Sequence, residues 1–199
     1  MIALQHFFPI LIAYLLGSIP TAYLLSKRKG VDIFATGTGN PGAGNIFREI
    51  GRKTGFLVFI VDSAKGYLSV LLAVLVFLMD GYWIILVAIL SITGHLYSVF
   101  TKFKGGGGLA TLIGVSLYLV PNAIFIGAIP SIILLILLSD AVWASIIGFV
   151  IAAIADLVIF QYPQVRIVSI LSIGVILLIR MLMMEYYRTK RGKTIHEPV

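Results

Sequence analysis

Six long apolar stretches constrain this chain of 199 residues more than any other feature. They lie near 7–25, 56–79, 82–100, 109–138, 141–160 and 165–184. About 20 consecutive apolar residues let a helix cross the hydrocarbon core of a bilayer, where a helix satisfies its own backbone hydrogen bonds. Only 12% of the residues are charged, against about 25% in soluble domains. The sequence therefore predicts an all-α polytopic membrane protein with one integral membrane domain, residues 1–199.

The stretch 109–138 is too long for one crossing, and Pro121 with Asn122 predicts a turn near its middle. Lysine and arginine favour the cytoplasmic side of a membrane. Basic residues occur in the loops 26–54 and 101–108 and in the tail 185–199. All three fall on one side only if 109–138 crosses the membrane twice. We therefore expect seven transmembrane helices, with the N-terminus outside and the C-terminus in the cytoplasm.

The net charge, the absence of cysteine and the spacing of the histidines limit the partners and cofactors that the chain is expected to bind. The net charge is +7, and lysine and arginine residues on the cytoplasmic side of a membrane protein account for such an excess. The charge is therefore no evidence for a nucleic acid partner. The chain has no cysteine, and His6, His95 and His196 are too far apart in sequence for a helical metal-binding pair. We expect no metal and no cofactor. The sequence does not indicate an oligomeric state.

Polar, glycine-rich sequence gathers in four segments on the predicted cytoplasmic side: 17–25, 32–48, 62–66 and 94–108. The second contains a G-x-G-x-x-G match, but a basic membrane loop precedes it instead of a strand, so a dinucleotide fold is excluded. Successive glycine N–H groups, followed by a helix N-terminus, can bind an anion. With lysine and arginine nearby, these segments predict a site for phosphorylated ligands.

Individual residues of these segments leave alternatives open. Asp62 and Lys65 lie three positions apart, hence on one helix face, and fit a functional pair or a structural ion pair equally well. His95 fits a catalytic base or a hydrogen-bonded core residue equally well. Lys104 before four glycines favours ligand binding, because packing does not explain a run of glycines with its entropic cost. Asp156, isolated from these segments, is interpreted as a packing or interface residue.

The four segments resemble the bacterial PlsY family, the acyl-phosphate:glycerol-3-phosphate acyltransferases. The resemblance rests on G-S-I-P-T at 17–21, D-I…G-T-G-N-x-G-A-x-N at 32–45, D-x-x-K-G at 62–66 and G-H…V-F…F-K-G-G at 94–106. It implies a seven-helix inner-membrane enzyme that transfers an acyl chain from acyl phosphate to the 1-hydroxyl of glycerol 3-phosphate. The products would be lysophosphatidic acid and phosphate, and membrane lipid would surround the acyl tail.

The resemblance also implies roles for individual residues. His95, Lys104 and Asp62 would be catalytic, with His95 accepting the hydroxyl proton and Lys104 holding the leaving phosphate. A substrate phosphate oxygen is an alternative proton acceptor. Arg48, Lys65, Asn40 and Asn45 would hold glycerol 3-phosphate. The full set expected to bind substrate is Ser18, Thr21, Gly37, Gly39, Asn40, Gly42, Asn45, Arg48, Lys65, Gly105, Gly106 and Gly107.

The chain departs from the family pattern at several motif positions. Arginine, threonine and lysine are usual in the family at the positions of Phe34, Gly44 and Gly107, and the C-terminal histidine and asparagine correspond to Met181 and Met184. An alternative hypothesis follows from these losses. The chain would then be a non-catalytic or repurposed paralogue that binds phosphorylated lipid or a lipid precursor at the cytoplasmic face.

Overall fold

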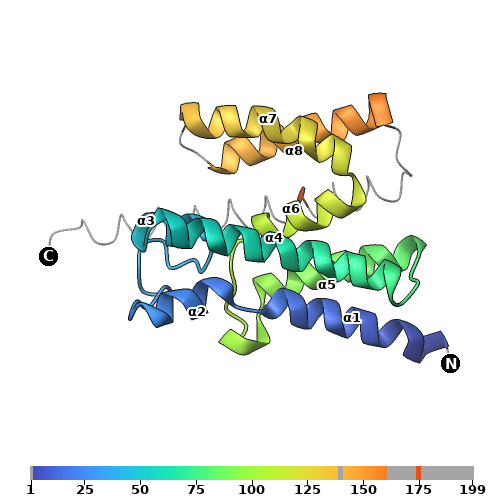
Figure 1. Ribbon diagram of the computed structural model, residues 1–199, viewed down its shortest axis with the longest axis horizontal. Coiled ribbons are helices and arrows are strands. Elements are labelled where there is room, and N and C mark those ends of the chain that lie inside the picture. The colour runs from blue at the N-terminus through green and yellow to red at the C-terminus, as the bar shows by residue number, and fades with distance from the viewer. Residues whose placement is uncertain (1, 139–140, 161–173, 176–199) are drawn as a thin grey trace, which may run out of the picture.

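The computed structural model describes residues 2–138, 141–160 and 174–175, and within them every regular element is helical (Figure 1). This confirms the all-α prediction. The elements are α1 (Ile2–Ser18), α2 (Thr21–Arg28), α3 (Ala43–Glu49), α4 (Arg52–Leu75), α5 (Gly81–Leu96), the 3-10 turn η1 (Val99–Thr101), α6 (Leu109–Leu119), α7 (Pro121–Leu138), α8 (Ala141–Ala155) and the π-helical turn η2 (Asp156–Phe160).

Four described segments are long and apolar enough to cross a membrane: His6–Arg28, Arg52–Leu75, Gly81–Thr101 and Trp143–Phe160. The predicted break in 109–138 is present, because α6 ends at Leu119 and α7 begins at Pro121. Proline suits the first position of a helix, where its missing N–H is not needed. Apart from residues 174 and 175, the stretch predicted at 165–184 lies outside the described residues. The number of crossings stays a prediction.

Two of the predicted spans contain a break that the sequence analysis did not predict. The stretch 7–25 is not one continuous helix, because Pro20 separates α1 from α2. Proline has no backbone N–H and disfavours helical conformation in the residue before it, here Ile19. The stretch 82–100 ends as an α-helix at Leu96, and a turn then leads into η1. Both helix ends contribute to the site described below.

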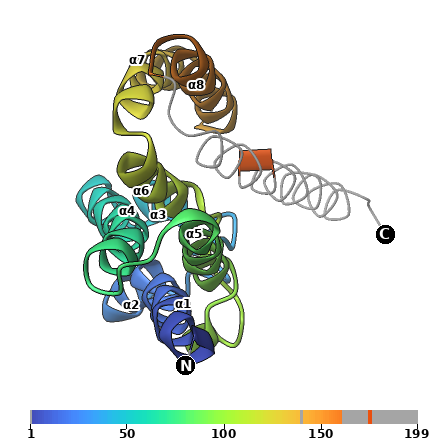
Figure 2. The same ribbon diagram turned by 90° about the vertical axis from the view of Figure 1, so that its right-hand side faces the viewer.

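The helices α1, α4 and α5 lie side by side, α6 packs on α4, and α7 and α8 form a separate pair (Figures 1 and 2). Glycine makes the close contacts between them. A Cβ on Gly114 of α6 would collide with the Ser63 carbonyl of α4, and one on Gly94 of α5 would collide with the Tyr14 carbonyl of α1. Such small residues let helix backbones approach closely in membranes, where the hydrophobic effect does not drive helices together.

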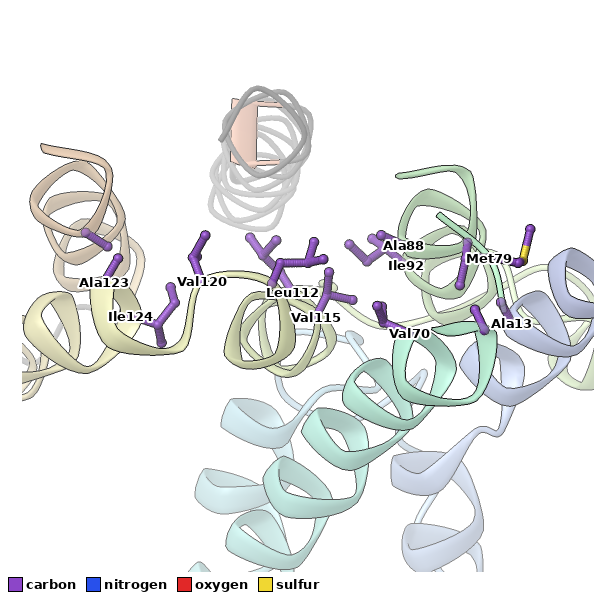
Figure 3. Packing of buried hydrophobic residues seen from close by; sticks show 14 of the residues in the cluster. Ala13, Val70, Met79, Ala88, Ile92, Leu112, Val115, Val120, Ala123 and Ile124 are labelled. Atoms are coloured by element: carbon purple, nitrogen blue, oxygen red, sulfur yellow. The ribbon is translucent and has the colours of Figure 1, made fainter. Parts of the chain in front are cut away.

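The main hydrophobic core fills the space between these helices, and Figure 3 shows Val70, Ala88 and Leu112 within it. A smaller core lies beside the glycine-rich loop that joins α2 to α3 (residues 29–42). Its buried members are Ala22, Ile33, Ile46 and Val58. This smaller core holds α2, the loop and α4 together at one end of the molecule, which is the end that contains the site.

Candidate functional site

A small cleft lies where the α1–α2 break and the end of α5 meet the middle of α4. All four polar segments predicted from the sequence contribute to it. Its lining includes Ser18, Ile19, Thr21, Tyr23, Pro41, Asp62, Lys65, His95, Ser98, Thr101, Lys104, Gly105 and Gly106. Residues as far apart in the chain as Ser18 and Gly106 therefore line one site.

The α1–α2 break supplies carbonyl groups that a continuous helix would have used internally. The Ser18 carbonyl accepts a hydrogen bond from the Ser98 hydroxyl at 2.5 Å, and the Ile19 carbonyl accepts one from Lys65 Nζ at 2.9 Å. The last carbonyls of a helix have no partner within the helix and need one elsewhere. The proline break thus ties α1 to both α4 and the segment after α5.

A buried ion pair lies at the centre of the cleft. Lys65 Nζ is 2.9 Å from Asp62 Oδ1, and the two side chains are 5% and 2% exposed. His95 Nδ1 lies 3.9 Å from the same carboxylate oxygen. Opposite charges that neutralise each other make burial inside a membrane span tolerable, and such groups usually mark a functional site. Asp62 therefore connects a lysine with a histidine in the lining of the cleft.

The segment Gly105–Gly106 packs directly against the end of α5. The Gly106 N–H donates to the His95 carbonyl at 3.1 Å, and a Cβ on Gly106 would lie 2.5 Å from His95 Nε2. A Cβ on Gly105 would collide with the carbonyls of His95 and Leu96. Both positions need glycine because backbone and ring leave no room for a side chain. Lys104 is exposed and also lines the cleft.

The glycine-rich loop before α3 is held mainly by Asn45, which is 3% exposed. Its amide nitrogen donates to the Thr36 carbonyl at 3.0 Å, and its amide oxygen accepts from the Thr38 N–H at 3.1 Å. Gly37 and Gly39 have φ of +58° and +69°, in the left-handed region that favours glycine. This loop contributes only Pro41 to the lining of the cleft.

The structure brings together eight of the predicted site residues in this lining: Ser18, Thr21, Asp62, Lys65, His95, Lys104, Gly105 and Gly106. The remaining seven are not among the lining residues: Gly37, Gly39, Asn40, Gly42, Asn45, Arg48 and Gly107. Arg48 is exposed on α3. Met181 and Met184 lie outside the described residues.

Seven residues of the lining were not predicted from the sequence, and three of them have polar side chains: Tyr23, Ser98 and Thr101. Ser98 and Thr101 stand between His95 and Lys104, so two hydroxyls between two suspected functional residues were the available signal. The Tyr23 ring lies 5.8 Å from the Phe34 ring, one of the positions that depart from the family pattern. Phe34 therefore fills space beside the cleft with an aromatic contact.

The donors in the cleft suit a phosphorylated ligand. Lys104 supplies a positive charge, and the hydroxyls of Ser18 and Thr21 are buried without a hydrogen-bond partner among the described residues. A serine or threonine hydroxyl can donate one hydrogen bond, so both can donate to a ligand oxygen in the cleft. Within residues 2–138, 141–160 and 174–175, no three histidine, aspartate or glutamate residues group as metal ligands would.

Comparisons with known proteins agree on one family. The sequence profile described as "Glycerol-3-phosphate acyltransferase" matches residues 7–192. A relative of that name from Trichlorobacter lovleyi is 43% identical over 173 residues, which are 83% of this chain and 85% of the relative. One from Geobacter metallireducens is 49% identical over 114 residues, which span 57% of this chain and 58% of the relative.

Two solved structures share the fold. A crystal structure of PlsY (YgiH), an integral membrane glycerol 3-phosphate acyltransferase, in its glycerol 3-phosphate form superimposes with a TM-score of 0.83 at 34% identity. The alignment covers 94% of this chain and 92% of the other. The lysophosphatidic acid form of PlsY gives a TM-score of 0.78 at 35% identity, with the same coverage.

Proposed function

This chain belongs to the glycerol-3-phosphate acyltransferase family, and we propose that it transfers an acyl chain to glycerol 3-phosphate. The acyl donor is acyl phosphate, and the products are lysophosphatidic acid and phosphate. The observation that best supports this activity is the cleft itself. It combines Lys104, the Asp62–Lys65–His95 cluster and two unpartnered hydroxyls in one lining.

In the proposed reaction, the 1-hydroxyl oxygen of glycerol 3-phosphate attacks the acyl carbonyl carbon and forms the new ester bond. The bond from that carbon to the phosphate oxygen breaks, and the phosphate leaves with the electron pair. The hydroxyl proton passes to His95 or to a substrate phosphate oxygen. Acyl phosphate is already activated, so positioning and charge stabilisation supply most of the catalysis.

The proposal gives different tasks to the two lysines, and their contacts support this division. Lys65 is already paired with Asp62 and the Ile19 carbonyl, so its proposed task is to hold the cleft together and keep Asp62 charged beside His95. Lys104 is the exposed lysine of the lining, so its proposed task is to bind the leaving phosphate. The hydroxyls of Ser18 and Thr21 would donate to a phosphate of either substrate.

The glycine-rich loop before α3 has a supporting task in this proposal. The amide of Asn45 is used by the loop backbone, so the residue shapes the loop instead of touching substrate. Arg48 and Asn40 stay proposed contacts for glycerol 3-phosphate. Neither lines the cleft, so each would need the bound substrate to extend beyond that lining.

The alternative function, binding of phosphorylated lipid without turnover, is favoured by one feature of the chain. Gly107 stands where the family has a lysine, so the glycine run after Lys104 has one fewer cation than the family pattern. The two functions differ in a single assay. Purified protein in lipid is given acyl phosphate and glycerol 3-phosphate, and released phosphate and lysophosphatidic acid are measured together.

We expect both products from the wild-type chain and a large loss in the Lys104→Ala variant. Lys53→Ala is the matched control, because Lys53 is exposed in the first turn of α4 and does not line the cleft. Absence of both products, with wild type and Lys104→Ala equally silent, favours the alternative. The Gly107→Lys variant then tests whether the missing lysine is responsible.

We also propose that the chain crosses the bacterial inner membrane seven times as one domain, with the N-terminus outside. The loops 26–54 and 101–108 and the tail 185–199 would then be cytoplasmic, which their lysine and arginine content supports. Because the chain has no cysteine, a single cysteine at position 189 reports its side directly. Labelling of that cysteine by a reagent confined to the outer face would overturn this topology.

A further inference from the structure

The segment that links α5 to Lys104 exposes large apolar side chains, three of them aromatic, next to a lysine. Tyr97, Val99, Phe100 and Phe103 are 50%, 42%, 58% and 61% exposed. Four large apolar side chains thus lie exposed within seven residues, 97–103, which we call the aromatic loop. In a protein that crosses a membrane, exposed apolar side chains face lipid, and aromatic ones are enriched where hydrocarbon meets water.

The aromatic loop is held in a strained conformation. Lys102 and Phe103 have φ of +53° and +61°, which is uncommon for any residue with a side chain and an outlier for a bulky one. Several hydrogen bonds maintain it. The Phe103 N–H donates to the Ser98 carbonyl at 2.8 Å, and the Thr101 hydroxyl donates to the Lys104 carbonyl at 2.6 Å. Such strain persists where the surroundings enforce it, and it is found at binding sites and clamps.

The position of the aromatic loop suggests what it contacts. It lies at one end of the candidate span Gly81–Thr101, so it falls at the edge of the membrane. Aromatic side chains prefer the interface between hydrocarbon and water, and lysine near the surface is attracted to anionic lipid headgroups. Lys102 is exposed between Phe100 and Phe103. Apolar rings beside a cation complement the chemistry of an anionic phospholipid.

We propose that the aromatic loop is a lipid-docking element. Phe100 and Phe103 insert into the headgroup region of the bilayer, and Lys102 pairs with the phosphate of an anionic phospholipid. The Thr101–Lys104 hydrogen bond makes this turn continuous with the residue that lines the cleft. Lipid contact therefore sets the position of Lys104 relative to the membrane surface. The proposal is independent of the acyl transfer proposed above, because docking requires no turnover.

Tryptophan fluorescence tests the insertion. Trp83 and Trp143 are replaced by phenylalanine, and Phe103→Trp is then reconstituted in phosphatidylcholine bilayers whose chains carry bromine, a contact quencher. We expect bromine near the headgroup to quench this tryptophan more strongly than bromine deep in the chain. Phe100→Trp is the second reporter, in case the strained position 103 disturbs folding. The matched control is Thr38→Trp, on the exposed polar loop before α3, which should stay unquenched.

Lipid selectivity tests the role of Lys102. A small fraction of brominated phosphatidylglycerol or of brominated phosphatidylcholine is mixed into unbrominated phosphatidylcholine, and quenching of the 103 reporter is compared. Attraction of about 1 kcal/mol per lysine predicts about fivefold preference for the anionic lipid. Lys102→Gln should abolish this preference, and Lys53→Gln should leave it unchanged.

Two results would overturn the proposal. One is quenching at positions 100 and 103 no greater than at position 38, which would mean that the aromatic loop does not enter lipid. The other is reporter emission that ignores brominated lipid but changes with protein density in the bilayer. That result would identify a second copy of the chain as the partner.

Discussion

Replacing Lys65 with methionine tests the buried ion pair most directly. The substitution removes the 2.9 Å contact with Asp62 and the 2.9 Å hydrogen bond to the Ile19 carbonyl. It leaves the Asp62 carboxylate, which is 2% exposed, without its lysine. Breaking a buried pair by removing one partner costs about 3–5 kcal/mol. For a chain of this size, each kcal/mol lowers the melting temperature by about 2–4 °C, so we expect a decrease of at least about 6 °C.

The matched variant removes both charges. In Asp62→Asn/Lys65→Met no uncompensated charge is left, and replacing a whole buried pair by neutral residues is often nearly neutral for stability. We therefore expect most of the melting temperature to return. Acyl transfer should stay lost, because His95 then has a neutral amide in place of the carboxylate 3.9 Å away. Unfolding is followed by tryptophan fluorescence in detergent, and activity by phosphate release.

Each outcome has a definite meaning. If Lys65→Met melts like the wild type, the buried pair does not contribute as its geometry indicates, and the reasoning fails. A double variant as unstable as Lys65→Met would refute the assignment of the loss to an unpaired carboxylate. A double variant that is stable and active would assign Asp62 and Lys65 a purely structural role.

Three further substitutions test the cleft and its support. Gly106→Ala places a Cβ 2.5 Å from His95 Nε2 and should lower kcat/KM roughly 10- to 100-fold. Gly44→Ala, with nothing within 4 Å, should leave kcat/KM unchanged, and equal losses in the two would contradict the packing argument. Asn45→Ala leaves the Thr36 carbonyl and the Thr38 N–H unpaired, so it should destabilise the protein by about 1–3 kcal/mol and expose the loop to protease. Unchanged protection would argue against the role of Asn45. Ser98→Ala removes the hydrogen bond to the Ser18 carbonyl, about 1 kcal/mol, and should raise KM about fivefold, with recovery in Ser98→Thr. An unchanged KM would separate Ser98 from the site.

Several features of the site were predictable because their causes are local in the chain. Asp62 and Lys65 lie three positions apart on one helix, so their contact follows from helix geometry alone. The break at Pro121 follows from the chemistry of proline. The grouping of four polar segments was also predictable, since the membrane separates polar from apolar sequence.

The membership of the cleft was not predictable, because the two glycine-rich loops look alike in sequence. The sequence analysis predicted that both Gly37 and Gly106 bind substrate. Gly37 turns a loop that is held by Asn45, whereas Gly106 packs against the His95 ring in the cleft. The hydrogen bonds of Ser98 and Lys65 to the α1–α2 break span 80 and 46 positions. No local pattern encodes contacts over such separations.

The sequence by itself determined that this chain is helical and built for a membrane, because apolar stretches in lipid must satisfy their own backbone hydrogen bonds. It also predicted the four polar segments that line the cleft. Only the tertiary structure decided which of their residues meet. The backbone carbonyls at the end of α1 accept hydrogen bonds from Lys65 and Ser98, and the His95 carbonyl at the end of α5 accepts one from Gly106. Close contacts at glycines bring α1, α4 and α5 near enough for these bonds to form. The physical reason is that a helix forms from its own residues, whereas a site forms from the ends that helices leave unsatisfied.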